Sequence, residues 1–298
     1  VTLSNCYTAT PDNDYTVAPV EAFRSVRCIN LYGTKKQTFG SDGSTSGTGM
    51  FKTVSRENMT GSGAAENMPL LNFDSVWAAK DGTTPQLRVF TGEQAEISGN
   101  IGSIWSGKIA TAYAGGSGTK ESPYKIATPE QLALLVSTSV YEPYETLGKY
   151  YEMTEDILLN NTTAENWYTA DGSRDWFFDL GYNSLGFMGC FNGNGHSVDG
   201  VCYKSTISDM CYGLFPSLGG SAVVENTAVS HFYSPENAHR SGAVAGFISL
   251  YADNENVIHI RKCVSAQSNI VGGLCAGGIL GHCAKPIVMS DCLSMAVV

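Results

Sequence analysis

The densest aromatic block of the chain, residues 163–187, also carries several charged side chains that could contact a ligand. Aromatic faces can stack on sugar rings, while carboxylate and guanidinium groups can hydrogen-bond sugar hydroxyls. This combination indicates a glycan-binding site, and its candidate residues are Trp167, Tyr168, Asp171, Arg174, Asp175 and Trp176. The alternative is that most of these rings cap a hydrophobic core. We expect Trp167 and Tyr168 to be the most exposed rings of the block.

A second stretch with residue types suited to chemistry is GCFNGNGHSVDG, residues 189–200, in which glycines and asparagines surround His196. The sequence contains neither HExxH nor a His-x-His pair, so zinc ligation by His196 has no support. No helix is expected after it, as a dinucleotide-binding glycine loop would require. We therefore expect a tight corner, with Phe191 and Val198 pointing inward and His196 as a hydrogen-bonding spacer.

Catalysis on polysaccharides would need acidic groups that meet in space. The acidic candidates, which could meet if neighbouring segments of the chain lie side by side, are Asp175, Asp179, Asp199 and Asp209. A lyase would add bound Ca²⁺ and a base such as Arg174 or Lys204. The carboxylates are scattered and no GxSxG elbow is present, so we assign no catalytic residue. We expect a non-catalytic protein, with a polysaccharide lyase or glycoside hydrolase as the alternative.

One segment could hold a structural ion. YADNENV, residues 251–257, places Asp253 and Glu255 close together and is a weak candidate for structural Ca²⁺. The alternative is a solvated loop. No other segment has the pattern of a cofactor site, so we expect no cofactor.

The composition excludes several classes of partner. The chain has 298 residues and a formal net charge of −10, without the basic stripe that nucleic-acid binding requires. No run of eighteen apolar residues occurs, so we expect no membrane span. The acidic, weakly charged composition is typical of extracellular bacterial proteins. The sequence opens without an initiator Met or a signal peptide, and we expect it to be an excerpt of a longer protein.

The nine cysteines could be disulfides or buried thiols. Their number is odd and no CxxC is present, which disfavours a zinc ribbon or a thioredoxin-like motif. Disulfides could form among Cys190, Cys202 and Cys211. We favour buried thiols acting as small hydrophobic residues, because several cysteines recur at equivalent positions of a repeat.

Two short patterns repeat along the chain. The first is an alternating apolar run ending in Asn or Cys, seen in VTLSNCYT (1–8), VVENTAV (223–229), IHIRKCVS (258–265) and IVMSDCLS (287–294). The second is Gly-x-apolar-apolar-Gly, seen in GAVAG (242–246) and GGILG (277–281), with a degenerate form in GLFPSLGG (213–220). Alternation predicts strands, and flanking glycines predict tight corners. Coils of roughly 25–35 residues predict a solenoid in which Asn and Cys share one ladder position.

One helix is predicted, over residues 128–140. Thr128 is a good N-cap, Pro129 follows at the first helical position, and Gln131 completes a capping box. The end of a solenoid exposes strand edges and apolar core that must be covered. We expect this helix to cap one end.

The ordered motifs resemble those of bacterial surface proteins that carry the GLUG motif. The matching pieces are GGSGTKESPYKIATPEQLALL (115–135), KYYEMTEDILLN (149–160), CFNGNGHSVDGVCY (190–203) and then GLFPSL, GAVAG and GGILG. Residues 57–90 are similar to the segment that often closes such modules. Pro216 departs from the pattern, since the family commonly has Gly there. The order predicts the end of one module at 1–90, a junction at 91–106 and a second module at 107–298.

The resemblance implies an all-β fold, a right-handed parallel β-helix, on the bacterial surface or secreted. It supplies no catalytic residues, because family members are mostly interpreted as adhesion, stalk or accessory modules. We therefore expect an extracellular module that binds host or cell-wall glycans or surface proteins, or that serves as a stalk. End-to-end stacking of coils into a fibre is a further alternative.

Overall fold

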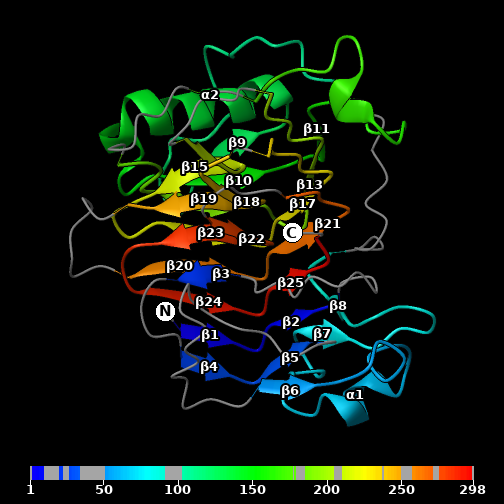
Figure 1. The fold of residues 1–298 in the computed structure, drawn as a ribbon. Helices are drawn as coiled ribbons and strands as arrows, with labels where there is room; N and C mark the ends of the chain where they lie inside the picture. The colour runs from blue at the N-terminus through cyan, green and yellow to red at the C-terminus, as the bar shows by residue number, and fades with distance from the viewer. Residues whose placement is uncertain are drawn as a thin grey trace.

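The structure is a computed structural model. It describes residues 2–9, 20–22, 27–33, 51–90, 103–176, 178, 185–204, 210–236, 238–249, 257–270 and 275–296. Within them, strands in parallel sheets dominate and helices are few, so the chain has an all-β fold. Figure 1 shows the strands stacked one above another, with the longest helix lying across one end.

Two long parallel sheets run the length of the stack. The first has the order β9 (Tyr124–Ile126), β10 (Tyr150–Met153), β12 (Cys190–Asn192), β16 (Val223–Glu225), β20 (Ile258–Arg261), β24 (Ile287–Ser290), β1 (Thr2–Ser4) and β4 (Arg27–Ile29). The second has the order β11 (Ile157–Leu158), β13 (Ser197–Asp199), β17 (Ala228–Ser230), β21 (Val264–Ala266), β25 (Leu293–Ser294), β2 (Tyr7–Thr8), β5 (Leu31–Gly33) and β6 (Phe51–Thr53). Each strand is short because the chain turns into the next sheet after a few residues.

Two smaller parallel sheets complete the set. One contains β15 (Phe215–Leu218), β19 (Ala245–Ile248), β23 (Leu280–Cys283) and β3 (Val20–Ala22); the other contains β14 (Cys211–Tyr212), β18 (Arg240–Gly242) and β22 (Cys275–Gly277). The successive strands β16, β17, β18 and β19 belong to four different sheets. The next strand, β20, returns to the first sheet and pairs with β16. Equivalent residues therefore stack, as Val224 does on Ile260 and Ile260 on Met289.

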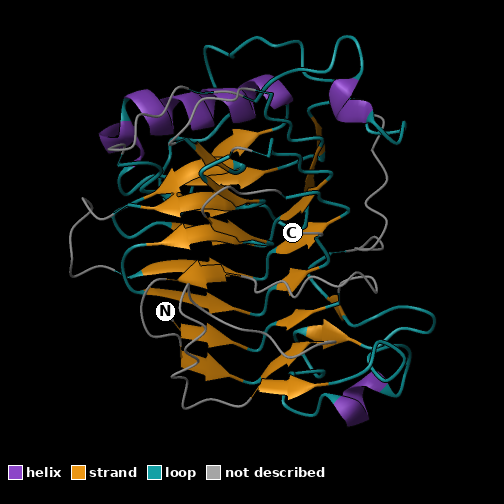
Figure 2. Ribbon diagram, viewed as in Figure 1, coloured by secondary structure: helices purple, strands orange, loops and turns teal. Residues whose placement is uncertain are grey.

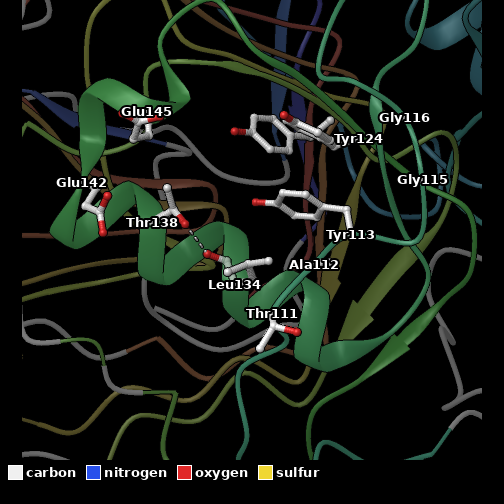
Figure 3. A pocket seen from close by; sticks show the side chains of 11 residues that line it. Thr111, Ala112, Tyr113, Gly115, Gly116, Tyr124, Leu134, Thr138, Glu142 and Glu145 are labelled. Carbon is white, nitrogen blue, oxygen red and sulfur yellow. Dashed lines mark hydrogen bonds between the residues drawn. The ribbon is translucent and has the colours of Figure 1, made fainter.

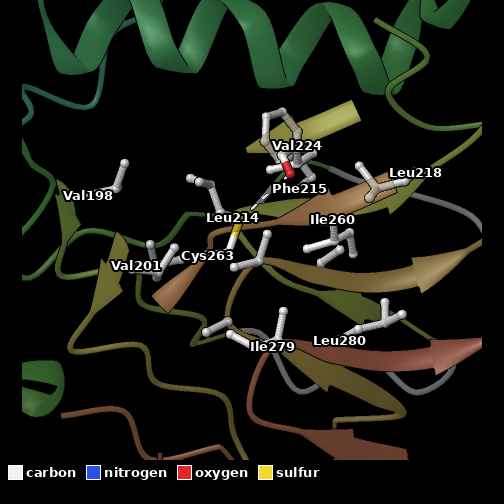
Figure 4. Packing of buried hydrophobic residues seen from close by; sticks show 14 of the residues in the cluster. Val198, Val201, Leu214, Phe215, Leu218, Val224, Ile260, Cys263, Ile279 and Leu280 are labelled. Carbon is white, nitrogen blue, oxygen red and sulfur yellow. Dashed lines mark hydrogen bonds between the residues drawn. The ribbon is translucent and has the colours of Figure 1, made fainter. Parts of the chain in front are cut away.

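The interior is filled by the inward-facing residues of these strands. Figure 4 shows Val224, Ile260, Phe215 and Leu280 converging from different strands, and all four are fully buried. Phe191 and Val198 are also buried, which confirms the expected inward orientation of both side chains in the 189–200 corner. Burial of this apolar surface is the main force that holds the stack together.

The predicted capping helix is confirmed. Helix α2 (Pro129–Tyr141) begins after Thr128, whose side chain accepts a hydrogen bond from the Gln131 amide. The Gln131 side chain accepts from the Ala127 amide, one residue before the position expected of a capping box. Leu132, Leu135 and Val136 are fully buried, and α2 covers the end of the stack at β9 (Figure 2). The short 3₁₀ helix η1 (Pro143–Thr146) follows it.

The N-terminal segment extends the sheets beyond the last strands of the chain. Strand β1 pairs in parallel with β24, and β2 pairs with β25. Residues 51–90 contain α1 (Ala64–Asn67) and the antiparallel pair β7 (Trp77–Ala78) and β8 (Gln86–Leu87). Met59, Trp77 and Leu87 form a second buried cluster with residues of the second long sheet. The predicted boundary at 91–106 stays a prediction, since residues 91–102 lie outside the described ranges.

The expectation that Asn and Cys share one ladder position is wrong. Asn226, Lys262, Asp291 and Asn5 take the same place in successive turns, and all have positive φ values between 52° and 54°. Asparagine and aspartate tolerate this left-handed conformation better than most residues. The Asn226 side chain donates to Asn192 Oδ1 at 2.9 Å, so amides do bond along the stack.

Cysteine occupies the next position, which points into the core. Cys263, Cys292 and Cys6 are each about 1% exposed or less. The eight cysteines whose side chains the structure describes are free thiols, and seven of them are buried. This agrees with the interpretation of the cysteines as small hydrophobic residues, and the pairing considered among Cys190, Cys202 and Cys211 is not formed.

Acidification is expected to weaken the fold through His282. Its ring is buried and stacked on Phe247 at 5.4 Å between centroids. Burial, with the nearby charge of Arg240, lowers the pKa of His282 to about 4. In the unfolded chain the imidazole takes up a proton more readily. The stability that comes from burying the neutral His282 ring is therefore fully present above pH about 6.5 and is lost as the pH falls toward about 4. Urea unfolding across that range measures the loss, and H282Q should show a shallower dependence.

Candidate ligand recess

A recess of about 370 Å³ opens beside the second long sheet. Its first wall is the loop 162–168, which ends in the 3₁₀ helix η2 (Trp167–Thr169). Its second wall consists of the turns that follow β17 and β21, at residues 231–233 and at Gln267 and Asn269. The stacking of β17 on β21 brings these two turns together, because Ser230 and Ala266 are register partners.

His231 lines this recess and is held by a buried aspartate that lies behind it. Asp199, at the end of β13, is 2% exposed and lies 2.7 Å from Nδ1 of His231 through its Oδ1 atom. The carboxylate also accepts hydrogen bonds from the hydroxyls of Ser230 and Thr162, at 2.6 and 2.7 Å. A carboxylate can only accept, so Nδ1 of His231 must carry the proton. In the neutral ring, Nε2 is then the atom that can accept a hydrogen bond from a ligand.

His231 has a left-handed backbone that repeats in the next turn of the stack. Its φ is 47°, in the left-handed region, and Gln267 takes the same conformation one coil further along, with a φ of 49°. The same left-handed conformation recurs at the turns after the first long sheet, so it belongs to the repeated geometry of the corners. The His231 amide donates to the Ala266 carbonyl, which fixes the turn against the next coil.

Aromatic rings complete the walls of the recess. Tyr168 and Tyr233 are stacked with 3.9 Å between centroids and 7° between planes, and both are half-buried. Trp167 contacts Tyr168 edge to face at 5.8 Å and lies 6.3 Å from the His231 ring. The expectation that Trp167 is exposed is wrong, since only 5% of it is accessible. Trp167 is therefore a buried ring that packs against Tyr168 and His231.

The remaining predicted residues do not line this recess. Asp171 and Arg174 are exposed on the turn that follows, and Asp175 accepts a hydrogen bond from the Lys204 amide. Trp176 is fully buried, and its Nε1 donates to the Leu214 carbonyl at 3.2 Å. Trp176 therefore belongs to the core, the alternative considered for the rings of this block.

Sequence reasoning missed His231, Tyr233, Gln267 and Asn269, and it considered Asp199 only as a catalytic carboxylate. These residues lie 31 to 101 positions from Tyr168, and no local pattern marks them. The available signal was the repeat itself: His231 and Gln267 each come directly after an equivalent strand.

The charge of the recess limits its ligands. Neither Lys nor Arg is among the residues that line it, and Glu165 contributes an exposed carboxylate. Lys204, one of the two candidate lyase bases, donates from Nζ to the Ser173 carbonyl at 2.8 Å. An anionic ligand would thus meet no fixed positive charge, whereas neutral hydroxyls would meet hydrogen-bonding groups and rings.

The other candidate groups lie elsewhere. His196 has a partner after all, because its Nδ1 lies 3.4 Å from Oδ1 of Asp156. That contact fits a residue that holds a corner in place. Asp253 and Glu255, the weak calcium candidate, lie outside the described residues, as do Asp179 and Asp209. Within the described ranges no group of three or more His, Cys, Asp or Glu side chains is arranged to hold a metal ion.

Comparisons with known proteins give two relatives. A segment of 124 residues, 42% of this chain, is 33% identical to a Gly-rich membrane protein of Evansella cellulosilytica. A segment of 185 residues, 62% of the chain, is 25% identical to halomucin of Haloquadratum walsbyi. The matches cover 13% and 2% of those two proteins, so the chain spans only a small part of either. No protein-family model and no solved structure matches the chain. No helix in the described ranges is long and apolar enough to cross a membrane.

Proposed function

We propose that this chain is a non-catalytic, right-handed parallel β-helix module of a bacterial extracellular protein, acting in adhesion through glycan binding. The route of the chain through four parallel sheets and the stacked register support the β-helix. The ordered GLUG-like motifs support the surface location, and the names of the two relatives, one a membrane protein, agree with it.

The observation that carries the proposal is the composition of the recess. A half-buried tyrosine pair, an imidazole fixed by Asp199 and the amide side chains of Gln267 and Asn269 surround one opening. Such sites combine apolar faces with a few placed polar groups. With Lys and Arg lacking among its lining residues, the recess favours neutral glycans over uronic acids or sulfated sugars.

Replacing Tyr168 with alanine should weaken glycan binding about tenfold. The change removes a ring wall and its stacking on Tyr233, and a tenfold loss corresponds to about 1.4 kcal/mol. A glycan array of neutral and acidic sugars identifies the probe, and titration calorimetry then compares wild type with Y168A. Tyr141→Ala, which removes a ring that is 60% exposed at the far end of α2, is the matched control. Equal affinities for the two variants would refute the assignment of this recess.

A polysaccharide-acting enzyme is the second candidate, favoured by the His231–Asp199 pair. An imidazole oriented by a buried carboxylate is the arrangement of a general base. Incubation with pectins, fructans and host glycans tests it through the appearance of new reducing or unsaturated ends. We expect none; activity that disappears in H231Q would replace the adhesion proposal with this one.

End-to-end assembly is the third candidate. Strands β4 and β6 are the last described strands of the two long sheets, at the end opposite α2. Edge strands of this kind can pair with another chain. Electron microscopy of concentrated protein distinguishes fibres, which this candidate requires, from single particles.

A further inference from the structure

A second recess, of about 480 Å³, lies under the capping helix at the end of the stack. It shares no lining residue with the glycan recess, which lies beside the second long sheet. Figure 3 shows the side chains of Tyr113 and Tyr124 extending toward the C-terminal half of α2, with their hydroxyls facing Thr138, Glu142 and Glu145. None of these residues has a role in the function proposed above.

Three tyrosines form one wall. Tyr113 is stacked on Tyr124 at 4.7 Å between centroids, and both contact the ring of Tyr151, at 5.6 and 5.5 Å. The Tyr113 hydroxyl lies close to those of Tyr151 and Thr138. Burial raises the pKa of Tyr113 to about 12, and burial likewise raises the pKa of Tyr151. The phenols therefore stay neutral and present lone pairs as well as protons to the recess.

Two carboxylates face this wall. Glu142 is the C-cap residue of α2, and Glu145 lies in η1; both are exposed. Glu145 lies near enough to Tyr151 that its negative charge adds to the raised pKa of that phenol. Lys, Arg and His do not occur among the residues that line the recess. The two carboxylates therefore favour a cation over an anion in this recess.

The remaining walls are apolar or small. Ala112 and Leu134 lie beside the tyrosine wall, and Gly115 and Gly116 form the adjacent backbone. At Gly116, where φ is 85°, an added Cβ would lie 1.9 Å from the Pro123 carbonyl oxygen, so this side of the recess requires glycine. The volume falls in the range of small-molecule sites.

We propose that this recess binds an alkylammonium group. The ammonium would donate its hydrogen bonds to tyrosine hydroxyls and to the carboxylates of Glu142 and Glu145, and its alkyl chain would lie along Leu134 and Ala112. Tyrosine faces add cation–π attraction. A lysine side chain of a partner and an amino sugar both carry this group. The site is independent of the glycan recess, so either assignment can fail without the other.

Titration of the full chain with n-butylammonium chloride, followed by NMR, tests the proposal. We expect saturable binding that weakens as salt is added, whereas n-butanol and butyrate bind far more weakly. Glu145→Gln should weaken n-butylammonium binding about two- to fivefold, the effect of losing one exposed ion pair. Glu57→Gln removes the same charge from an exposed position in the 51–90 segment and should change nothing.

Nα-Acetyl-lysine amide and glucosamine then distinguish the two sources of the group. Tighter binding of the lysine derivative indicates a protein partner, and tighter binding of glucosamine indicates an amino sugar; either result supports the site. Equal binding of n-butanol and n-butylammonium, or equal affinities of E145Q and E57Q, would overturn the proposal. Loss of binding in Y168A would also overturn it, since that residue lies in the other recess.

Discussion

Replacing Gly246 with alanine is expected to destabilise the protein by about 3 kcal/mol, the upper part of the range for overpacked cores. An added Cβ would lie 2.6 Å from the Tyr212 amide nitrogen, 2.8 Å from the Tyr212 carbonyl oxygen and 2.9 Å from the Pro216 carbonyl oxygen. These are backbone atoms of the neighbouring coil, which cannot rotate away as a side chain can. The free energy of unfolding, from urea denaturation, measures the effect.

Gly63→Ala is the matched control for this experiment. No atom lies within 4 Å of a Cβ built at Gly63, and its φ of −69° suits any residue. Its effect on the free energy of unfolding should stay within about 0.5 kcal/mol. If G246A and G63A unfold at the same urea concentration, the proposed backbone clash at Gly246 would be contradicted.

The same contact explains the Gly-x-apolar-apolar-Gly repeat. A Cβ at Gly242 would meet the Gly281 amide nitrogen at 2.4 Å, and one at Gly281 would meet the Gly246 carbonyl oxygen at 2.6 Å. The glycines of successive repeats thus pack backbone against backbone. None of these three needs a positive φ, so the requirement is space and not conformational freedom.

Replacing Trp176 with alanine is expected to cost about 3–5 kcal/mol of stability. The side chain is fully buried, packs edge to face on Trp105 at 5.0 Å and on Phe178 at 5.1 Å, and donates to the Leu214 carbonyl. Alanine would leave a cavity and an unpaired carbonyl. Thermal unfolding followed by circular dichroism measures the loss.

Trp176→Phe separates the core role from a binding role. It retains most of the ring but removes the indole hydrogen bond, so stability should fall by only about 1–3 kcal/mol. Its glycan affinity should equal that of the wild type, because Trp176 lies outside the recess. A W176F protein with unchanged stability and lower glycan affinity would show that Trp176 takes part in glycan binding.

The aromatic block 163–187 shows how far sequence reasoning reached. It located Trp167 and Tyr168, which do line a recess, together with Trp176, which does not. All three rings lie in the same aromatic and charged stretch of the sequence, so their local sequence does not distinguish them. Whether a ring points into the core depends on the path of the loop, and that path is fixed by contacts such as those of Asn160 with Arg174 and Gly200.

The repeats show a similar division. Alternation predicted the strands at 223–229, 258–265 and 287–294, and the helix was predicted within one residue at each end. The predicted alignment of these repeats was wrong by one residue, because it placed Asn226 opposite Cys263. The spacing of apolar residues is compatible with either Asn or Cys at the turn. Only the register, with Glu225 opposite Arg261, shows that Asn226 aligns with Lys262 and that Thr227 aligns with Cys263.

The sequence by itself determined the local elements: period-two alternation, glycine corners and helix caps are encoded within a few neighbouring residues. The tertiary structure decided which turns became neighbours. Tyr168, His231 and Gln267 meet because coils stack in register, and Tyr113 faces Glu145 because a helix closes the end of that stack. Contacts between residues tens of positions apart depend on this stacking, and no short-range pattern records them.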